Sequence, residues 1–224
     1  MYTIEKVSNL DHWDELVSLS DYNNIFFKSF FFKYLQNRID LKYIKKGNEI
    51  KAGFFLVTDQ DKKIIYDDDV TIHSGIIFFN DKKQILSSKN IEIFNIINYF
   101  VNYMNNQYSS VNFSTVINFP DLRPFIWYNY DKKGPKFKIN PRYTSVLNIS
   151  DLAKEDKNSK TYKNMSTLRK RLLRKGLELK PQFNYDYNLN YLIEKFEGYM
   201  IKQGQIVVKN KLVDMKNLII NLSE

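Results

Sequence analysis

Hydrophobic and polar residues along the first 150 positions follow the patterns of a sheet flanked by helices. Strands are indicated by alternation or by a short apolar run, and helices by apolar residues every three or four positions. The clearest helix spans residues 90–108, where an apolar stripe around Ile97 lies opposite a row of asparagines. The expected elements are, in order, a strand at 2–7, a helix capped by Asp11, a helix at 29–39, strands at 41–44, 50–58, 64–66 and 70–79, the long helix, a strand at 111–119, a short helix at 123–130 and a strand at 143–149.

Two details of this pattern bear on the sheet. Lys46-Gly47-Asn48 separates two strand signals and predicts a hairpin turn. The apolar run at 76–79 indicates a central strand buried on both faces, and Gly75 before it favours a bulge or a close approach of another part of the chain. The pattern therefore predicts an α/β (α+β) fold with a mixed, mostly antiparallel sheet flanked by helices.

The pattern changes after residue 150. No acidic residue occurs from 157 to 177, and a basic helix is expected at 160–176, with Leu168 and Leu172 facing the core and Gly176 as its C-cap. Two more helices are expected at 191–203 and 212–222. These helices have almost no strand signals to pack on. We expect a first domain at 1–140 and the start of a second at 141–224, completed by further chain or by a partner chain.

Composition narrows the chemistry. The 34 Lys and Arg residues outnumber 25 Asp and Glu, and the net charge of +9 favours polyanionic partners such as nucleic acid, phosphorylated substrates or an anionic membrane surface. The alternative explanation of this net charge is a general richness in lysine that has no functional meaning. Cysteine is absent and there are two histidines, which excludes disulfides, thiolate catalysis and a multi-His metal site. With no signal peptide and no apolar run of about 18 residues, the sequence predicts a cytoplasmic protein.

The segment 119–150 concentrates aromatic rings, two arginines and four prolines. Proline fixes φ and removes a backbone donor, so sharp joints are expected here. Guanidinium groups beside rings suit the wall of a polar pocket for phosphate or carboxylate. The alternative is that the rings pack on the core. The proposed substrate-binding residues are Arg123, Trp127, Tyr130, Arg142 and Tyr143, together with Lys33, which lies among phenylalanines.

Three further features carry both a functional and a structural interpretation. His73 is a candidate general base or a structural histidine. Asp67-Asp68-Asp69 fits a metal site or a solvated turn, and we expect no metal. The cations of the basic helix could hold phosphates of a nucleotide-linked substrate or of RNA, or could serve helix stability and solubility. These candidate anion- or tRNA-binding residues are Lys170, Arg171, Arg174 and Lys175.

Two stretches resemble the FemAB-like branch of the GNAT acyltransferase superfamily. Residues 142–149 read Arg-Tyr-Thr-Ser-Val-Leu-Asn-Ile, and residues 164–176 read Asn-Met-Ser-Thr-Leu-Arg-Lys-Arg-Leu-Leu-Arg-Lys-Gly. In that branch, a strand opening the second domain precedes a basic helix ending in glycine. The aromatic stretch 25–35 and His73-Ser74-Gly75 also resemble parts of the first domain.

The resemblance implies two GNAT-like domains and transfer of an acyl or aminoacyl group to an amine of a peptidoglycan or surface-polysaccharide precursor. The acyl-CoA pyrophosphate loop of ordinary acetyltransferases is not visible, so the donor stays open between acetyl-CoA and aminoacyl-tRNA. Such a transfer needs positioning and an oxyanion donor, which a backbone N–H on a splayed strand can supply. The alternatives are a degenerate GNAT-fold binding or assembly protein and a nucleic-acid-binding module.

Overall fold

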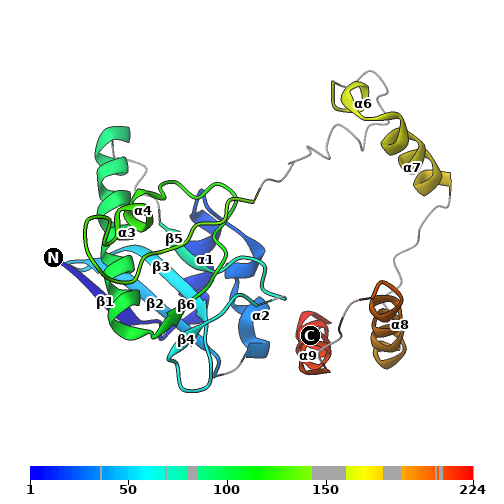
Figure 1. The fold of residues 1–224 in the computed structure, drawn as a ribbon, viewed down its shortest axis with the longest axis horizontal. Helices are drawn as coiled ribbons and strands as arrows, with labels where there is room; N and C mark the ends of the chain where they lie inside the picture. Colours follow the sequence, from blue (N-terminus) through cyan, green and yellow to red (C-terminus); the bar gives the residue numbers. More distant parts are fainter. Residues whose placement is uncertain are drawn as a thin grey trace. The chain divides into compact units, whose positions relative to one another are not determined.

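The computed structural model describes residues 1–35, 37–68, 70–79, 85–142, 160–178, 188–204, 206 and 209–223. The chain divides into two compact units, one combining Met1–Ile139 with Ile193–Glu224 and the other comprising Asn140–Leu192. Figure 1 labels their helices and strands. The strand expected at 143–149 lies outside the described residues.

The first unit holds the sheet and most of the helices. Its elements are β1 (Tyr2–Lys6), α1 (Leu10–Leu19), the short 3-10 turn η1 (Ile25–Phe27), α2 (Ser29–Phe32), the 3-10 turn η2 (Lys33–Leu35), β2 (Ile39–Lys46), β3 (Glu49–Val57), β4 (Ile64–Ile65), β5 (Gly75–Phe78), α3 (Leu86–Gln107), β6 (Ser110–Val111), α4 (Arg123–Trp127) and α9 (Lys209–Ser223). The helix α8 (Leu189–Lys202) begins in the second unit and ends in the first.

Four strands form an antiparallel sheet in the order β1-β2-β3-β5. The predicted α+β fold with an antiparallel sheet is confirmed to this extent. The prediction that the run at 76–79 is a central strand is wrong, because β5 stands at the end of this order. It is nevertheless buried along its length, since rings from outside the ladder, including Phe113 and Phe119, pack against it.

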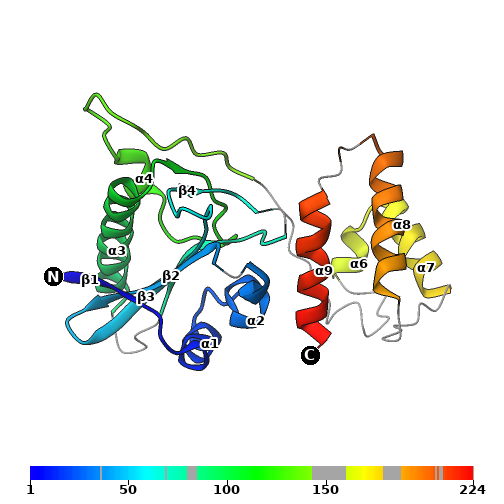
Figure 2. The same cartoon turned by 90° about the horizontal axis from the view of Figure 1, so that it is seen from below.

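The sheet separates two hydrophobic clusters. Alternate residues of β3 enter opposite clusters, because side chains of a strand point to opposite faces. Phe55 and Val57 pack with Trp13 from α1, whereas Phe54 and Leu56 pack against α3. Figure 2 shows α3 on one side of the strands and α1 and α2 on the other. The predicted long helix is confirmed, with its stripe around Ile97 buried.

The two helices before β2 differ from the prediction. The N-cap of α1 is Asn9, whose Oδ1 accepts a hydrogen bond from the His12 N–H at 3.0 Å, and Asp11 lies within the helix. Asparagine caps helices as well as aspartate does, so the helix begins earlier. The helix expected at 29–39 ends at Leu35, and Ile39 already starts β2. Short helical turns bury several phenylalanines here, so tertiary packing and not helical periodicity determines the local structure.

The outer side of the sheet is irregular. Ile65 pairs with Thr58 and Gly75 pairs with Phe55, so the chain departs from β3 after Ile65 and returns to it at Gly75. Of the strand expected at 111–119, only β6 forms, and it pairs in parallel with β4. Gly75 has φ +95°, and a Cβ added to it would lie 2.8 Å from the ring of Phe113. The part of the chain that approaches this glycine closely, as predicted, is thus the side chain of Phe113.

In the second unit, the basic segment forms two helices, α6 (Lys160–Asn164) and α7 (Thr167–Glu178). The continuous helix predicted at 160–176 is interrupted because Ser166 caps α7, its Oγ accepting from the Arg169 N–H at 3.3 Å. Gly176 lies inside α7 and is not a C-cap. Leu168 and Leu172, which were expected to be buried, are 64% and 58% exposed.

Candidate functional site

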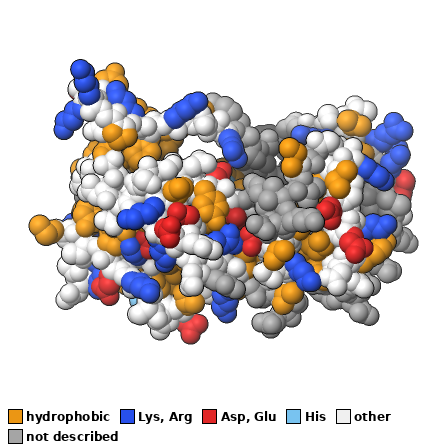
Figure 3. Space-filling model, turned by 60° about the horizontal axis from the view of Figure 1, so that its bottom comes forward, with side chains coloured by type: hydrophobic (Ala, Val, Ile, Leu, Met, Phe, Trp, Pro, Cys, Tyr) orange, Lys and Arg blue, Asp and Glu red, His pale blue; other side chains and the backbone are white. Residues whose placement is uncertain are grey.

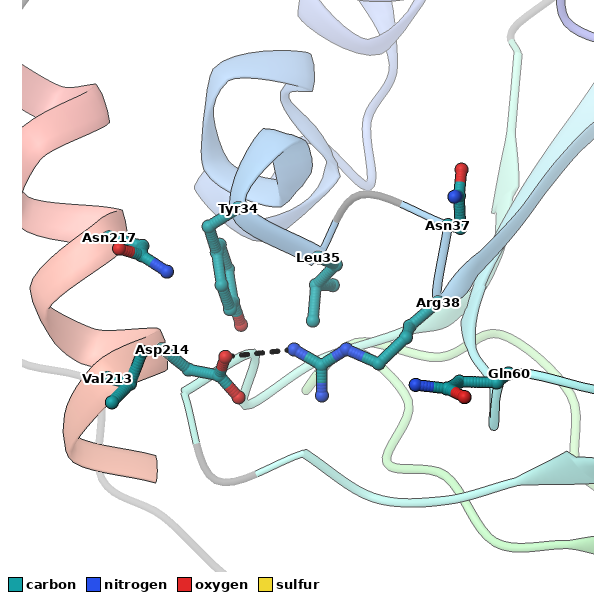
Figure 4. A pocket seen from close by; sticks show the side chains of 8 residues that line it. All are labelled: Tyr34, Leu35, Asn37, Arg38, Gln60, Val213, Asp214 and Asn217. Atoms are coloured by element: carbon teal, nitrogen blue, oxygen red, sulfur yellow. Dashed lines mark hydrogen bonds and ion pairs between the residues drawn. The ribbon is translucent and has the colours of Figure 1, made fainter. Parts of the chain in front are cut away.

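A pocket of about 610 Å³ lies in the first unit, where η2, the start of β2, the turn after β3 and α9 meet. Figure 4 shows that side chains from all four segments point toward it. Most of them are polar, and hydrogen-bonding groups in a concave site are the usual way of orienting a small ligand. The lining residues are Tyr34, Leu35, Asn37, Arg38, Gln60, Val213, Asp214 and Asn217.

Tyr34 anchors one wall of this pocket. Its hydroxyl donates to Asp68 Oδ2 at 2.7 Å and lies 2.8 Å from Thr71 Oγ1. The same carboxylate oxygen accepts from the Thr71 N–H at 2.8 Å, so it closes a turn within residues 66–74. Burial raises the pKa of Tyr34, and the carboxylate of Asp68 adds to this effect. The phenol is therefore a neutral group that fixes the turn beside the pocket.

Arg38 forms the floor and connects α9 to the sheet. Its Nη1 donates to the Tyr66 hydroxyl at 3.0 Å and its Nη2 donates to Asp214 Oδ1 at 2.9 Å. Burial opposes the charge on Arg38, but the bonds with Asp214 and Tyr66 outweigh it and raise its pKa. Leu212 and Leu218 of α9 are buried, and Leu218 joins the cluster around Trp13. Both polar and apolar contacts thus hold this helix.

We expect Arg38→Gln to weaken the attachment of α9, because Asp214 loses a charge-assisted hydrogen bond worth about 1.5–3 kcal/mol. Hydrogen–deuterium exchange should show faster exchange in residues 209–223 and little change in α3. Asp214→Asn should have a similar effect, and the double variant should exchange no faster than either single one. Additive effects of the two substitutions would contradict a direct coupling between these side chains.

The pocket can bind a polar ligand through amide groups and the guanidinium, and its apolar walls are Leu35 and Val213. Within the described residues, no three His, Asp or Glu side chains are placed to hold a metal ion. Asp67 and Asp68 instead accept bonds from hydroxyl groups, at 2.9 Å from Ser114 and 2.7 Å from Tyr34. Asp69 lies outside the described residues.

Of the substrate-binding residues predicted from the sequence, the structure brings Arg123 and Trp127 together on α4. The guanidinium lies 5.7 Å from the Trp127 ring centroid and 5.3 Å from that of Phe94. It also makes hydrogen bonds of 2.6–3.1 Å to both carboxylate oxygens of Asp121, which lower the pKa of that carboxyl. Tyr130 is exposed three residues beyond α4. The stacked arginine is a surface feature, apart from the pocket.

The remaining residues predicted from the sequence are Arg142, Tyr143, Lys33 and His73. Arg142 belongs to the second unit, and Tyr143 lies outside the described residues. Lys33 is exposed on η2. His73 is half-buried edge-on to Phe26 at 5.7 Å, and its buried Nδ1 has no hydrogen-bond partner among the described residues.

The candidate anion-binding residues all lie on α7. The ammonium of Lys170 lies 5.3 Å from the Tyr162 ring centroid and 3.1 Å from the carbonyl of Lys163, so it is partly engaged within its own unit. Arg174 faces Glu178 at 3.7 Å in an exposed pair. Arg171 and Lys175 are exposed.

The pocket residues escaped the sequence analysis for a physical reason. Tyr34 and Arg38 lie just before β2, whereas Asp214 follows more than 170 positions later on α9. A local sequence pattern cannot predict a contact between segments so far apart in the chain. The periodicity that predicts a helix also does not show which distant segment its apolar face contacts.

Neither protein-family models nor curated proteins nor solved structures give a match to this chain. Of the helices in the described ranges, none combines the length and the apolar character needed to cross a membrane.

Proposed function

We propose that this chain is an acyl- or aminoacyltransferase of the GNAT type, similar to the FemAB-like branch. It would move an acyl group from acetyl-CoA or aminoacyl-tRNA onto an amine of a cell-envelope or surface-polysaccharide precursor. The order of strands and helices from β1 to α4 is compatible with this proposal. The observation that supports it is the buried outer side of β5, which no backbone hydrogen bond joins to residues 115–119 in the described part of the chain.

The chain after β6 first follows its neighbours and then separates from them. The N–H of Asn112 donates to the carbonyl of Ile65 at 2.9 Å, and the N–H of Ser74 donates to that of Ser114 at 2.8 Å. Beyond this point, no backbone hydrogen bond in the described part of the chain joins residues 75–78 to 115–119. Two neighbouring strands that diverge leave amide groups without ladder partners.

The amides of β5 that face away from β3 can be identified from the alternation of the strand. The Phe79 N–H donates to Lys51 on β3 at 2.9 Å, whereas the Ser74 N–H points away from β3. The N–H groups of Ile76 and Phe78 therefore also point away from β3. In the proposed reaction, one of them would donate to the acyl oxygen as the amine attacks the carbonyl carbon. The bond from that carbon to the donor sulfur or oxygen breaks, and the amine proton ends on the leaving group.

The proposed acceptor-binding groups are Arg123 and Trp127, with Tyr130, Arg142 and Tyr143 retained from the sequence analysis. Their guanidinium and aromatic groups suit an anionic or nucleotide-linked acceptor. His73 stays a candidate base, since its buried Nδ1 has no hydrogen-bond partner among the described residues. The polar pocket beside Arg38 offers a second place for a polar acceptor.

The proposal is tested by incubating the full chain with each donor and a panel of amine acceptors. Release of coenzyme A can be followed with a thiol reagent, and the chain contributes no background because it lacks cysteine. Aminoacyl-tRNA consumption is followed by loss of the labelled amino acid from tRNA. Transfer to an amine from either donor is expected. If neither donor binds in calorimetry nor is consumed, the transferase proposal is wrong.

The tRNA arm has its own variant. With Lys170, Arg171 and Arg174 changed to Gln, tRNA should bind more weakly, and the salt dependence should flatten by about 2–3 units of log–log slope if all three contact phosphates. An unchanged affinity across the salt titration would assign these cations to a solvated face and favour acetyl-CoA as the donor. It would also favour the alternative of a binding or assembly protein if no transfer is seen.

A further inference from the structure

We propose that α4 and the loop after it form a face that docks on an anionic lipid membrane surface. This inference shares Trp127 and Tyr130 with the proposed acceptor site, but it does not depend on the transferase reaction. The docking face combines exposed apolar side chains with a group of lysines. It comprises Leu122, Ile126, Trp127, Tyr130, Lys132, Lys133, Lys136 and Lys138.

The apolar part of the docking face arises from the way α4 packs. This short helix buries Pro124 and Phe125 against the protein and turns the next two residues outward. Ile126 is 51% exposed, Trp127 54% and Tyr130 67%. Large aromatic side chains with a polar tip are favoured at the boundary between water and lipid, and adjacent aliphatic groups gain by entering it.

The basic part follows within a few residues. Lys132, Lys133, Lys136 and Lys138 are all exposed, against the single acidic residue Asp131 in the same stretch. Figure 2 shows the chain beyond α4 projecting from the sheet, and Figure 3 shows basic and hydrophobic side chains together on the projecting part at the upper left. Lysines beside exposed apolar groups complement a layer of anionic headgroups over hydrocarbon.

Internal hydrogen bonds give this loop a defined shape. Asn129 has φ +52°, and its side chain donates to the carbonyl of Pro135 at 3.0 Å across the loop. The ammonium of Lys136 donates to the carbonyl of Tyr130 at 3.0 Å and lies 5.9 Å from its ring centroid. The ring of Trp127 packs edge-on to Phe94 at 5.9 Å. The aromatic groups are thus held at the surface by the fold.

The observations favour a membrane over RNA as the occupant. Bases gain affinity by stacking on rings, but aliphatic side chains such as Ile126 and Leu122 add little to stacking. The guanidinium of Arg123 is held by both oxygens of Asp121 and two rings, so the exposed positive charges of the docking face are its lysines. An apolar surface rimmed by lysines fits lipid better than a nucleic-acid backbone.

The chain carries its own probe for this contact. It has two tryptophans, and Trp13 is fully buried, so a change in emission on adding vesicles reports on Trp127. The full chain is mixed with vesicles of phosphatidylcholine alone or of equal parts phosphatidylcholine and phosphatidylglycerol. We expect flotation and a blue shift with the anionic vesicles and neither with the zwitterionic ones. Trp127→Phe should float while losing the shift.

Variants separate the docking face from general charge. Each lysine near an anionic surface contributes about fivefold in partitioning, so Lys132→Gln with Lys133→Gln should lower the partition coefficient about 30-fold. Lys6→Gln with Lys63→Gln removes the same charge from exposed sites outside this loop and should have a much smaller effect. Ile126→Ser should weaken partitioning, and Ile25→Ser, at a site with 54% exposure on η1, should not.

Three outcomes would overturn the proposal. One is the absence of flotation with anionic vesicles. Another is an equal loss of vesicle binding in the Lys132/Lys133 and Lys6/Lys63 double variants, which would show that binding depends on net charge alone. The third is quenching of Trp127 by unacylated tRNA at concentrations where vesicles leave its emission unchanged, which would assign the face to RNA. Circular dichroism confirms that each variant is folded before it is tested.

Discussion

Replacing Trp13 with alanine is expected to lower the free energy of unfolding by about 3–5 kcal/mol, the range for deleting a large buried aromatic side chain. The Trp13 ring is fully buried between α1 and the sheet and lies edge-on to Phe79 at 6.0 Å. Its Nε1 also donates to the carbonyl of Phe27 at 2.6 Å, so alanine leaves that acceptor unpaired. Urea unfolding followed by circular dichroism measures the loss.

The same contact can be tested from the opposite side. A Cβ on Gly53 of β3 would lie 2.4 Å from the Trp13 ring, so Gly53→Ala forces the ring to move and should cost about 1–3 kcal/mol. With Trp13→Phe in the background, the smaller ring leaves room, and the double variant should cost less than the sum. Gly198→Ala, which has nothing within 4 Å on α8, should be neutral or stabilising. Additive costs at Gly53 and Trp13 would show that the close approach does not govern this site.

Asp40→Ala is expected to cost about 3–5 kcal/mol, because it removes the carboxylate from a buried ionic cluster and leaves the charge of Lys42 without its counterion. Asp40 is buried in β2, and its Oδ2 lies 3.0 Å from the ammonium of Lys42 and accepts from Tyr108 and, at 3.3 Å, from Tyr103. Both tyrosines lie at the end of α3, so this carboxylate fastens the helix to the sheet. Asp11→Ala, at an exposed position of α1, is the matched control.

The same cluster should contribute to a loss of stability at alkaline pH. Burial and then the hydrogen bond with Asp40 raise the pKa of Tyr108 above its ordinary value of 10.0. Burial alone would lower the pKa of Lys42, but bonds with Tyr103 and Asp40 outweigh it and raise that pKa above 10.5. Groups with raised folded-state pKa values stabilise most below their unfolded values, so stability should fall as pH rises above about 10.

Tyr108→Phe removes one of these groups and should flatten that alkaline decline while lowering stability at neutral pH by about 0.5–1.5 kcal/mol. The comparison is made by urea unfolding of both proteins at neutral and alkaline pH. An identical slope in the two proteins would mean that Tyr108 does not contribute to the alkaline transition.

The sequence patterns predicted the elements whose signal is local. The long helix α3 was predictable because its stripe repeats over many turns, and the β2–β3 hairpin because Gly47, with φ +61°, supplies a turn between two apolar runs. The position of β5 at the end of the sheet could not be predicted. A strand buried by aromatic rings has the same apolar run as a strand buried between two neighbouring strands. The prediction of a helix at 29–39 was wrong for a related reason. The positions of the aromatic residues there reflect packing in the core and not helical periodicity.

The candidate site was less predictable than the fold. Arg123 and Trp127 could be paired from their spacing on one short helix, but Asp121 as their partner could not. The pocket depends on the contact between Arg38 and Asp214, which only the folded chain reveals. Sequence patterns report which side chains share a face, whereas a site depends on which faces meet.

The departure of residues 66–74 from the hairpin has a consequence for how this fold can diversify. The segment leaves beside Thr58 and returns beside Phe55, so its two ends are held roughly 10 Å apart by three residues of one strand. Closing a longer segment over the same gap costs only about 0.6 kcal/mol for each doubling of its length. Insertions here would leave the pairing of β3 with β5 unchanged. A longer segment could therefore change the shape and chemistry of the wall beside Tyr34 while the scaffold stays constant.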